Sequence, residues 1–395
     1  MQHHEVDTDR VTASGTMPTG STAPPAPAGP VAPSGPVAPA GPVGPAGPVG
    51  PTGLVDPVGP VDPVAGRLTA GEILAGYLHA RAGDFLRGLR LYGESGADTA
   101  AADEAARTLR GAARRIGGTL HTYRPLLDPA WADQLRTELA WLCGTLAQEH
   151  ACTSRLHRLL GALGRLSGAG ARAGSEAPGP RAGALPVGTL TVGASRAGAL
   201  LERQLTLART RAHSSALQAL GSSRFHAVAD AVAVLASEVP LAPMAGAPAV
   251  EVLAGPGEAT EAQLLDAVAA LPLARAAHPY NAEALVHGLA TTSDGETQDA
   301  PWHQVRRLLR LHRYTQEVWC AGGSPDPELL AAGQSLDRHR DAAEAAAAAA
   351  NAARTPRIAP TTAYALGVLH ADQRHEVEAA RFAFQQLWQK AAVAR

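Results

Sequence analysis

The spacing of the apolar residues constrains this chain more than any other feature. From about residue 70 to residue 391, apolar residues recur every three or four positions, which is the period of a helix with one buried face. No stretch of useful length shows the alternation typical of a half-buried strand. Aromatic residues make up only 4% of the chain and hydrophobic residues 46%, so aliphatic and small side chains must fill the core. We therefore predict an all-α fold.

Caps, prolines and glycine-rich breaks set the expected helix boundaries. Thr69 and Glu72 form the T-x-x-E pattern of a capping box, so the first helix should begin there. Asp128 and Pro129 mark the start of a third helix, which we expect to be interrupted before it resumes to about residue 166. The expected helices cover about 70–91, 98–123, 129–166, 194–220, 222–237, 261–290, 299–320, 326–352 and 361–391.

Residues 1–66 differ from the rest in composition. From Pro24 to Pro63 the chain repeats glycine, proline, valine and alanine with almost no charge, and such a segment cannot bury enough surface to offset the entropy of ordering. We predict a disordered Pro/Gly-rich tail over 1–66 and a helical domain over 67–391, with a first half at about 67–240 and a second half at about 260–391. Residues 167–188, rich in glycine, alanine and proline, should form a linker between helices.

The charge balance limits what an anion site could be. The formal net charge is −2, and the tail alone has one arginine against five acidic residues. Removing this surplus of four negative charges leaves +2 on the rest of the chain. The whole molecule is therefore not strongly basic, and any anion site must be local.

Two segments far apart in the sequence repeat one pattern of cations. Arg107 to Arg115 and His303 to Arg313 both read cation-x-x-Arg-x-x-x-Arg. These spacings place the side chains on one helix face, where like charges repel by about 0.2–0.5 kcal/mol per pair. We find no acidic residue at the matching i+4 positions, so a bound anion would relieve the repulsion. One such face is typical of solvated surface, but two matched faces in two helical halves favour an anion site.

At these residues the chain resembles the CHAD family, the conserved histidine α-helical domain. The family motif H-x-M-R-V-x-x-R-R-L-R, continuing to F-R-P-L-L, is matched by Arg110, Arg114, Arg115 and the segment 123–127. The second motif, H-x-x-R-x-x-x-K-R-x-R-Y, is matched within 303–314. The resemblance implies two four-helix bundles related by a pseudo-twofold. It also implies that inorganic polyphosphate is bound by histidines and basic residues.

The motifs and the resemblance together assign one set of candidate polyphosphate-binding residues. The set is Arg107, Arg110, Arg114, Arg115, Arg124, His303, Arg306, Arg310, Arg313 and His339. Arginines can hold successive phosphates by charge-assisted hydrogen bonds, often bidentate. His339 and Asp341 are two residues apart and face different sides of a helix, so we expect His339 to face phosphate or solvent rather than a metal.

The chain departs from the family pattern in its first half. Arg107 stands where the family has its first histidine, and arginine keeps its charge near neutral pH where histidine loses it. Gly117 stands where the family pattern has an arginine. The pair His150-Ala151 stands where the family pattern has Arg-Asp. The first half-site is therefore eroded, and the alternative function is an interaction scaffold that keeps the fold without the ligand.

Enzymatic and nucleic-acid functions find little support in the sequence. There is no P-loop, G-x-G-x-x-G or G-x-S-x-G, and with Lys390 as the single lysine no E-x-E-x-K motif exists. The basic segments lack the interleaved aromatics that stack on bases. We predict a non-enzymatic protein without cofactor or metal. Three cysteines without C-x-x-C, expected as buried thiols, and the lack of a signal peptide favour a cytoplasmic location, and the resemblance suggests association with polyphosphate granules.

Overall fold

The computed structural model describes residues 68–96, 98–168, 187–280, 292–320 and 326–393. The chain separates into two compact units, Met1–Thr52 and Gly53–Arg395, and all described residues belong to the second. The predicted tail and nearly all of the predicted linker lie outside the described residues, so these two predictions remain untested.

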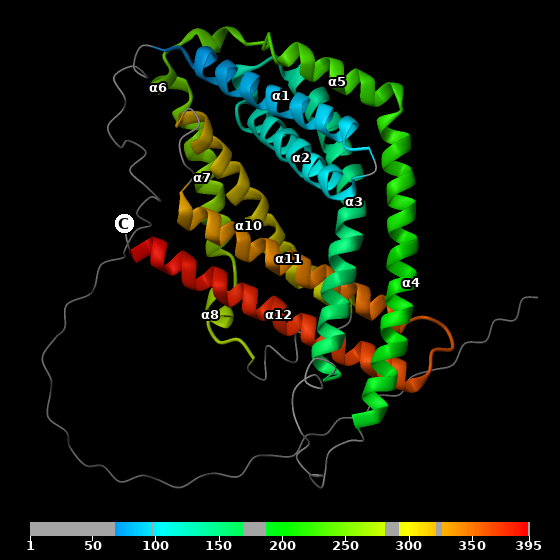
Figure 1. Cartoon of the computed structure of the whole chain (residues 1–395). Coiled ribbons are helices and arrows are strands. Elements are labelled where there is room, and N and C mark those ends of the chain that lie inside the picture. Colours follow the sequence, from blue (N-terminus) through cyan, green and yellow to red (C-terminus); the bar gives the residue numbers. More distant parts are fainter. Residues whose placement is uncertain (1–67, 97, 169–186, 281–291, 321–325, 394–395) are drawn as a thin grey trace, which may run out of the picture. The chain divides into compact units, whose positions relative to one another are not determined.

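Every regular element of the described residues is a helix (Figure 1). Two isolated β-bridges, Thr69 with Pro248 and Leu127 with Leu241, are the β-pairing that this part of the chain contains. The all-α prediction is confirmed. The longer helices are α1 (Ala70–Glu94), α2 (Thr99–Thr122), α3 (Pro129–Leu166), α4 (Val187–Leu220), α5 (Ser223–Leu235), α7 (Ala254–Ala269), α10 (Thr292–Trp319), α11 (Pro327–Ala353) and α12 (Pro360–Val393). The short ones are η2 (Arg124–Leu126), η4 (Pro243–Gly246), α6 (Ala249–Val252) and α8 (Leu273–Ala276).

Four boundary predictions were wrong. The helix expected from about 194 is α4, which begins at Val187. The helix expected over 261–290 is α7, which ends at Ala269; Pro272 follows it, lacks an N–H and disfavours helix in the residue before it. The expected interruption of the third helix is absent, because α3 is one continuous helix of 38 residues. Helix α10 begins at Thr292 rather than near 299, and it includes Pro301.

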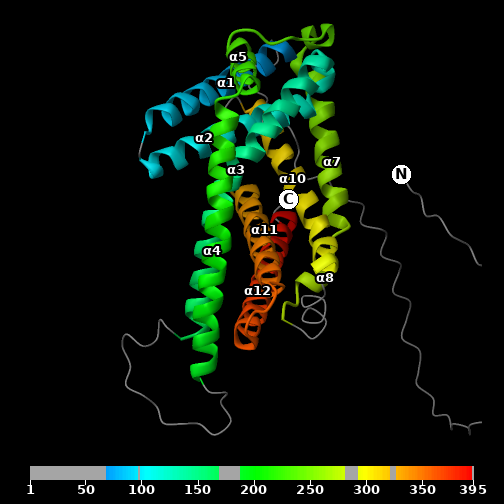
Figure 2. The same ribbon diagram turned by 90° about the vertical axis from the view of Figure 1, so that its right-hand side faces the viewer.

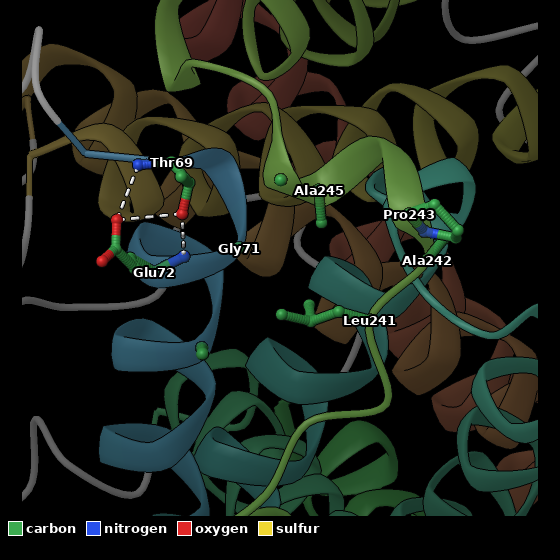
Figure 3. A pocket seen from close by; sticks show the side chains of 9 residues that line it. Thr69, Gly71, Glu72, Leu241, Ala242, Pro243 and Ala245 are labelled. Carbon is green, nitrogen blue, oxygen red and sulfur yellow. Dashed lines mark hydrogen bonds between the residues drawn. The ribbon is translucent and has the colours of Figure 1, made fainter.

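Side-chain caps fix where α1 and α3 begin. At α1, the Glu72 amide donates to Thr69 Oγ1 at 3.2 Å and the Thr69 amide donates to Glu72 Oε2 at 2.7 Å (Figure 3). This is the reciprocal capping box that the sequence predicted. At α3, the Trp131 amide donates to Asp128 Oδ1 at 2.8 Å, and Pro129 occupies the first turn, where its missing N–H costs nothing.

The helices contact one another in the same order in both halves. In the first half α1 contacts α2, α2 contacts α3, and α3 contacts α4; in the second, α7, α10, α11 and α12 contact in the same succession. Between the halves, α2 contacts α10, α3 contacts α11, and α4 contacts α12 (Figures 1 and 2). Three helices of the first half thus meet their counterparts in the second, which is the contact pattern of a pseudo-twofold.

The two halves also share a hydrophobic core. One apolar cluster lies among α1, α2, the start of α3 and α5, and a second lies among α7, α10, α11 and the end of α12. A third combines the far end of α3 with α4, α11 and α12, and includes Leu163, Leu201 and Leu366. The alanine-rich tract of α11 lies in this region, and its buried alanines let α12 pack closely against it. Two separate bundles are therefore joined by a third layer of packing.

Helix α2 crosses α10 at very close range. A Cβ atom added to Gly118 would lie 2.5 Å from Tyr314 Cδ2 and 3.2 Å from Leu311 Cδ2, closer than carbon atoms normally approach. A Cβ added to the neighbouring Gly117 would meet no atom within 4 Å. Glycine at 118 is therefore required by the crossing, whereas glycine at 117 is not.

These two glycines give a matched test of the crossing. We expect Gly118→Ala to lower the free energy of unfolding by about 1–3 kcal/mol, because the added methyl group overpacks the crossing. Gly117→Ala should raise it by up to about 1 kcal/mol, because alanine is the better helix former. Urea unfolding followed by circular dichroism measures both. Equal stability of the two variants would contradict the close crossing.

Candidate anion-binding site

The two cation-rich motifs lie on α2 and α10, the helices that cross at Gly118. The buried faces of the two helices carry Leu109, Ile116 and Leu120 on α2 and Val305 and Leu309 on α10. Burying these apolar faces fixes the rotation of each helix about its axis. The motif side chains are therefore held around the crossing rather than distributed over independent surfaces.

Arg114 of α2 and Arg310 of α10 each lie one helical turn before a residue of the crossing, Gly118 and Tyr314 respectively. Burial and the charge of Arg306 lower the pKa of Arg310 to about 10, with a further contribution from Arg114. The pKa of Arg110 is also lowered, by burial and then by Arg114. Arg114 itself is exposed. Arg114 thus lies within electrostatic reach of arginines from both motifs, and at this point the structure brings the two halves of the candidate site together.

No carboxylate among the described residues hydrogen-bonds to these three arginines. Arg110 is 6% exposed and donates to the carbonyl oxygens of Leu146 at 3.1 Å and Ala106 at 3.2 Å. Arg310 donates to the carbonyl oxygen of Arg306 at 3.5 Å. Such carbonyl bonds satisfy donors without neutralising the positive charge. We call Arg110, Arg114 and Arg310 the unpaired arginine cluster.

The other predicted arginines form ion pairs, which corrects the expectation that the motif faces lack acidic neighbours. Glu317 stands four residues after Arg313, and their charged groups lie 3.9 Å apart. The remaining pairs are Arg107 with Glu104 at 2.6 Å, Arg115 with Glu317 at 2.7 Å, Arg124 with Asp133 at 2.8 Å and Arg306 with Asp337 at 2.5 Å. The i+4 rule missed these partners because most are at other spacings or on other helices.

Arg115 has a structural role at the α1–α2–α10 junction. Its Nε donates to Glu317 Oε2 at 2.7 Å, and its guanidinium lies 5.7 Å from the centroid of the Tyr314 ring. The hydroxyl of Tyr77 on α1 donates to the same carboxylate oxygen at 2.9 Å. One carboxylate therefore joins three helices, and Arg115 is held away from a free anion-binding position.

The two predicted histidines lie in different environments. His303 is exposed, and its pKa is lowered mainly by burial of part of the ring. His339 is 1% exposed, so the expectation that it faces phosphate or solvent does not hold in this structure. Its ring stacks on Trp302, and its Nε2 lies 3.4 Å from Asp299 Oδ1 and 3.3 Å from Arg381 Nε. His339 is held in the core by an ionic cluster.

Asp299 is the centre of that cluster. It accepts hydrogen bonds from Arg374 at 2.7 Å and from Arg381 at 2.7 Å, and all three side chains are buried. Burial alone would raise the pKa of Asp299, but the hydrogen bonds and charges of His339 and Arg374 lower it well below its usual range. The carboxylate stays ionised and compensates the two buried guanidiniums. Asp299, Arg374 and Arg381 could not be identified from the sequence, because only the fold brings α10 and α12 together.

Three further basic residues near the crossing were also missed. His121, Arg136 and Arg307 come from α2, α3 and α10, and Arg136 Nη1 lies 2.7 Å from His121 Nδ1. His121 could have been found from the sequence, since it follows Arg114 by seven residues and so continues the same helix face.

Comparison with known proteins agrees with this architecture. The family model described as "CHAD domain" matches residues 81–321, which is more than half of the chain. The chain therefore belongs to the CHAD domain family. A similar solved structure is that of PptA from Streptomyces chartreusis, with 60% sequence identity and a TM-score of 0.67; the match covers 82% of this chain and 100% of that one. A search of curated proteins found no match.

The structure also describes the cysteines, the hydrophobicity of the helices and the groups that could bind a metal. The cysteines are free, but the expectation that they are buried is wrong: Cys320 is exposed, and Cys143 and Cys152 are half-buried. Within the described ranges, no helix is both long and apolar enough to cross a membrane. The same residues contain no group of three or more histidine, cysteine, aspartate or glutamate side chains that could hold a metal ion.

The buried ionic cluster predicts how stability depends on pH. Burial, together with the charges of Arg381 and His303, lowers the pKa of His339 to about 4, although Asp299 acts in the opposite direction. His339 is thus neutral in the folded state, and its contribution to stability is complete above the unfolded pKa near 6.5. As pH falls from about 6.5 to about 4, we expect the free energy of unfolding to fall, with His339 contributing up to about 3 kcal/mol.

The variant His339→Gln isolates this contribution. We expect it to be less stable than wild type at pH 7, because a buried contact is changed, but to lose less stability between pH 6.5 and pH 4. His121 and His303, whose pKa values are also lowered, contribute a slope of the same sign and remain in the variant. Urea unfolding across this pH range measures both proteins. Parallel pH profiles would contradict a neutral, buried His339.

Proposed function

We propose that this protein binds inorganic polyphosphate, without chemically changing it, at the crossing of α2 and α10. The observation that carries the proposal is the unpaired arginine cluster. Arg114 and Arg310 come from matching positions of two repeated motifs, lie within electrostatic reach of each other, and have no carboxylate partner among the described residues. Like charges held together in this way are stabilised when an anion lies between them.

The arrangement suits a linear polyanion better than a single phosphate. Arg110 and Arg114 are one helical turn apart on α2, and Arg306 and Arg310 are one turn apart on α10. Successive turns would therefore meet successive phosphates, with His303 at the outer end of the α10 row. His339 is not part of the proposed contact surface. It supports α10 from beneath, through its stacking on Trp302 and its ring contact with His303.

The ion pairs of the candidate arginines support the alternative function, an interaction scaffold. Arg107, Arg115, Arg124, Arg306 and Arg313 all form ion pairs with carboxylates, so half of the ten candidate residues are already paired without a ligand. A scaffold, however, gives no reason for the unpaired arginine cluster. Association with polyphosphate granules would follow from the binding proposal and needs no additional feature of the fold.

The proposal predicts which arginines matter most. Arg114→Ala and Arg310→Ala should each weaken binding of long-chain polyphosphate by about tenfold or more, because each removes a charge-assisted contact of about 1.5–3 kcal/mol. Arg107→Ala and Arg306→Ala should have smaller effects, because Glu104 and Asp337 already neutralise those side chains. Arg209→Ala is the matched control, since Arg209 is exposed on α4. Isothermal titration calorimetry measures all five.

Salt dependence tests whether charge is the basis of binding. A single-stranded polyanion loses affinity with salt at a log–log slope of about −0.7 per neutralised charge. The double variant Arg114→Ala, Arg310→Ala should therefore have a shallower slope than wild type, by about 1.4. Unchanged affinity and slope in the double variant would overturn the proposed site. No measurable binding by the wild-type protein at low salt would favour the scaffold alternative.

A further inference from the structure

We propose that an apolar pocket at the start of α1 binds the chain's own segment 55–64. This segment lies a few residues before Leu68, the first residue that the structure describes, so the partner is covalently attached. None of the candidate polyphosphate-binding residues lines the pocket, so the contact is independent of the proposed function. Disorder in the predicted tail would then be confined to the residues before 55.

The pocket lies between the first turns of α1 and the segment 241–246 (Figure 3). Its volume is about 500 Å³, and its walls include the apolar side chains of Ala75 and Leu241. The two polar side chains on its wall, Thr69 and Glu72, already bond to each other in the capping box, where Thr69 Oγ1 donates to Glu72 Oε2 at 2.9 Å. The pocket therefore suits an apolar ligand better than a polar one.

Close packing against α1 fixes the shape of the pocket. A Cβ atom added to Gly71 would lie 2.8 Å from Leu241 Cδ1 and 3.1 Å from the carbonyl oxygen of Ala245. Slightly farther along the chain, the Ala249 amide donates to the carbonyl oxygen of Leu68 at 3.1 Å. Both walls are thus held in place without a ligand, and an incoming segment would meet a preformed surface.

Large apolar side chains are exposed at this end of the molecule. Leu241, on the wall of the pocket, is 41% exposed, and Met244, whose two chain neighbours line the pocket, is 56% exposed. Leu68 and Val250, which flank the paired backbone, are 37% and 43% exposed. Four of the eleven exposed large apolar side chains in the described part of the chain therefore lie in two short, adjacent segments. An exposed apolar patch of this kind marks a contact surface.

Segment 55–64 has an apolar edge that the earlier part of the tail lacks. Its valines recur at every third residue, and a proline precedes each of the last three: Val55, Val58, Val61 and Val64. A polyproline II helix has three residues per turn, so it would place these valines along one edge and Asp56 and Asp62 along another. Farther from the fold, valines recur only at every sixth residue, at positions 31, 37, 43 and 49.

The covalent connection favours this segment over a separate partner. Thr69 lines the pocket five residues after Val64, and five residues span at most about 17 Å. A short tether gives an effective concentration on the order of millimolar, so weak apolar contacts are enough to fill the pocket. A polyproline II segment also loses little conformational entropy when it binds. With the valine edge in the pocket, the aspartate edge faces away from Glu72.

The test follows the methyl resonance of Met244, one of three methionines in the full chain. We expect Val58→Asp, Val61→Asp to move this resonance, because charged side chains release the segment from an apolar pocket. The matched double variant Val31→Asp, Val37→Asp adds the same charge to the tail and should leave the resonance in place. The difference should persist at high salt, because apolar contacts are not screened. A resonance moved equally by both double variants, or by neither, would overturn the contact.

A substitution in the pocket tests where the segment binds. Ala75 is half-buried on the pocket wall, so Ala75→Gln should fill the pocket and make the Met244 resonance insensitive to Val58→Asp, Val61→Asp. Ala80→Gln, at an exposed position of α1, is the control and should preserve the sensitivity. Thermal unfolding confirms that each variant is folded. Full sensitivity in Ala75→Gln would exclude this pocket. A wild-type resonance that changes on dilution would assign the pocket to the tail of a second copy and overturn the intramolecular contact.

Discussion

The close crossing of α2 over α10 is the constraint on which the rest of the structure depends. Gly118 permits it, because any side chain there would meet the ring of Tyr314. The crossing brings like charges together, and each such pair costs about 0.2–0.5 kcal/mol at a helix surface. Full burial of a leucine or isoleucine contributes about 1.5–3 kcal/mol, and Leu109, Ile116 and Leu309 are all buried beneath the motifs. Apolar packing therefore outweighs the repulsion and holds the arginines in place without a ligand.

The positions of the carboxylates determine the role of each arginine. Glu317 is shared by Arg115 and Arg313 and also accepts from Tyr77, so it joins three helices. In the second half, Asp299 of α10 is shared by Arg374 and Arg381, both of α12. Within the part of the chain that the structure describes, no carboxylate hydrogen-bonds to Arg110, Arg114 or Arg310, so their positive charge is not neutralised by a direct ion pair. The same residue type thus stabilises the fold in one place and, in our proposal, binds an anion in another.

Much of this could be predicted from the sequence because helical patterns are local. The apolar spacing predicted the helices, Thr69 and Glu72 predicted a capping box, and the repeated cation pattern placed the two motifs on matched helices. The partners of the arginines could not be predicted, because Arg115 and Glu317 are 202 residues apart and meet only in the folded chain. The burial of His339 was missed for the same reason: Asp299, Trp302 and Arg381 surround it from two other helices.

The central claim is that Arg114 and Arg310 repel each other until a polyanion binds. Thermal unfolding of wild type and of Arg114→Ala, each with and without long-chain polyphosphate, tests it most directly. Without ligand, removing Arg114 should leave stability unchanged or slightly raised, because the repulsion is relieved. With ligand, wild type should gain more in Tm than the variant, because a ligand stabilises the folded state according to its affinity. A variant that is less stable than wild type without ligand, yet gains the same increase in Tm with polyphosphate, would contradict the account.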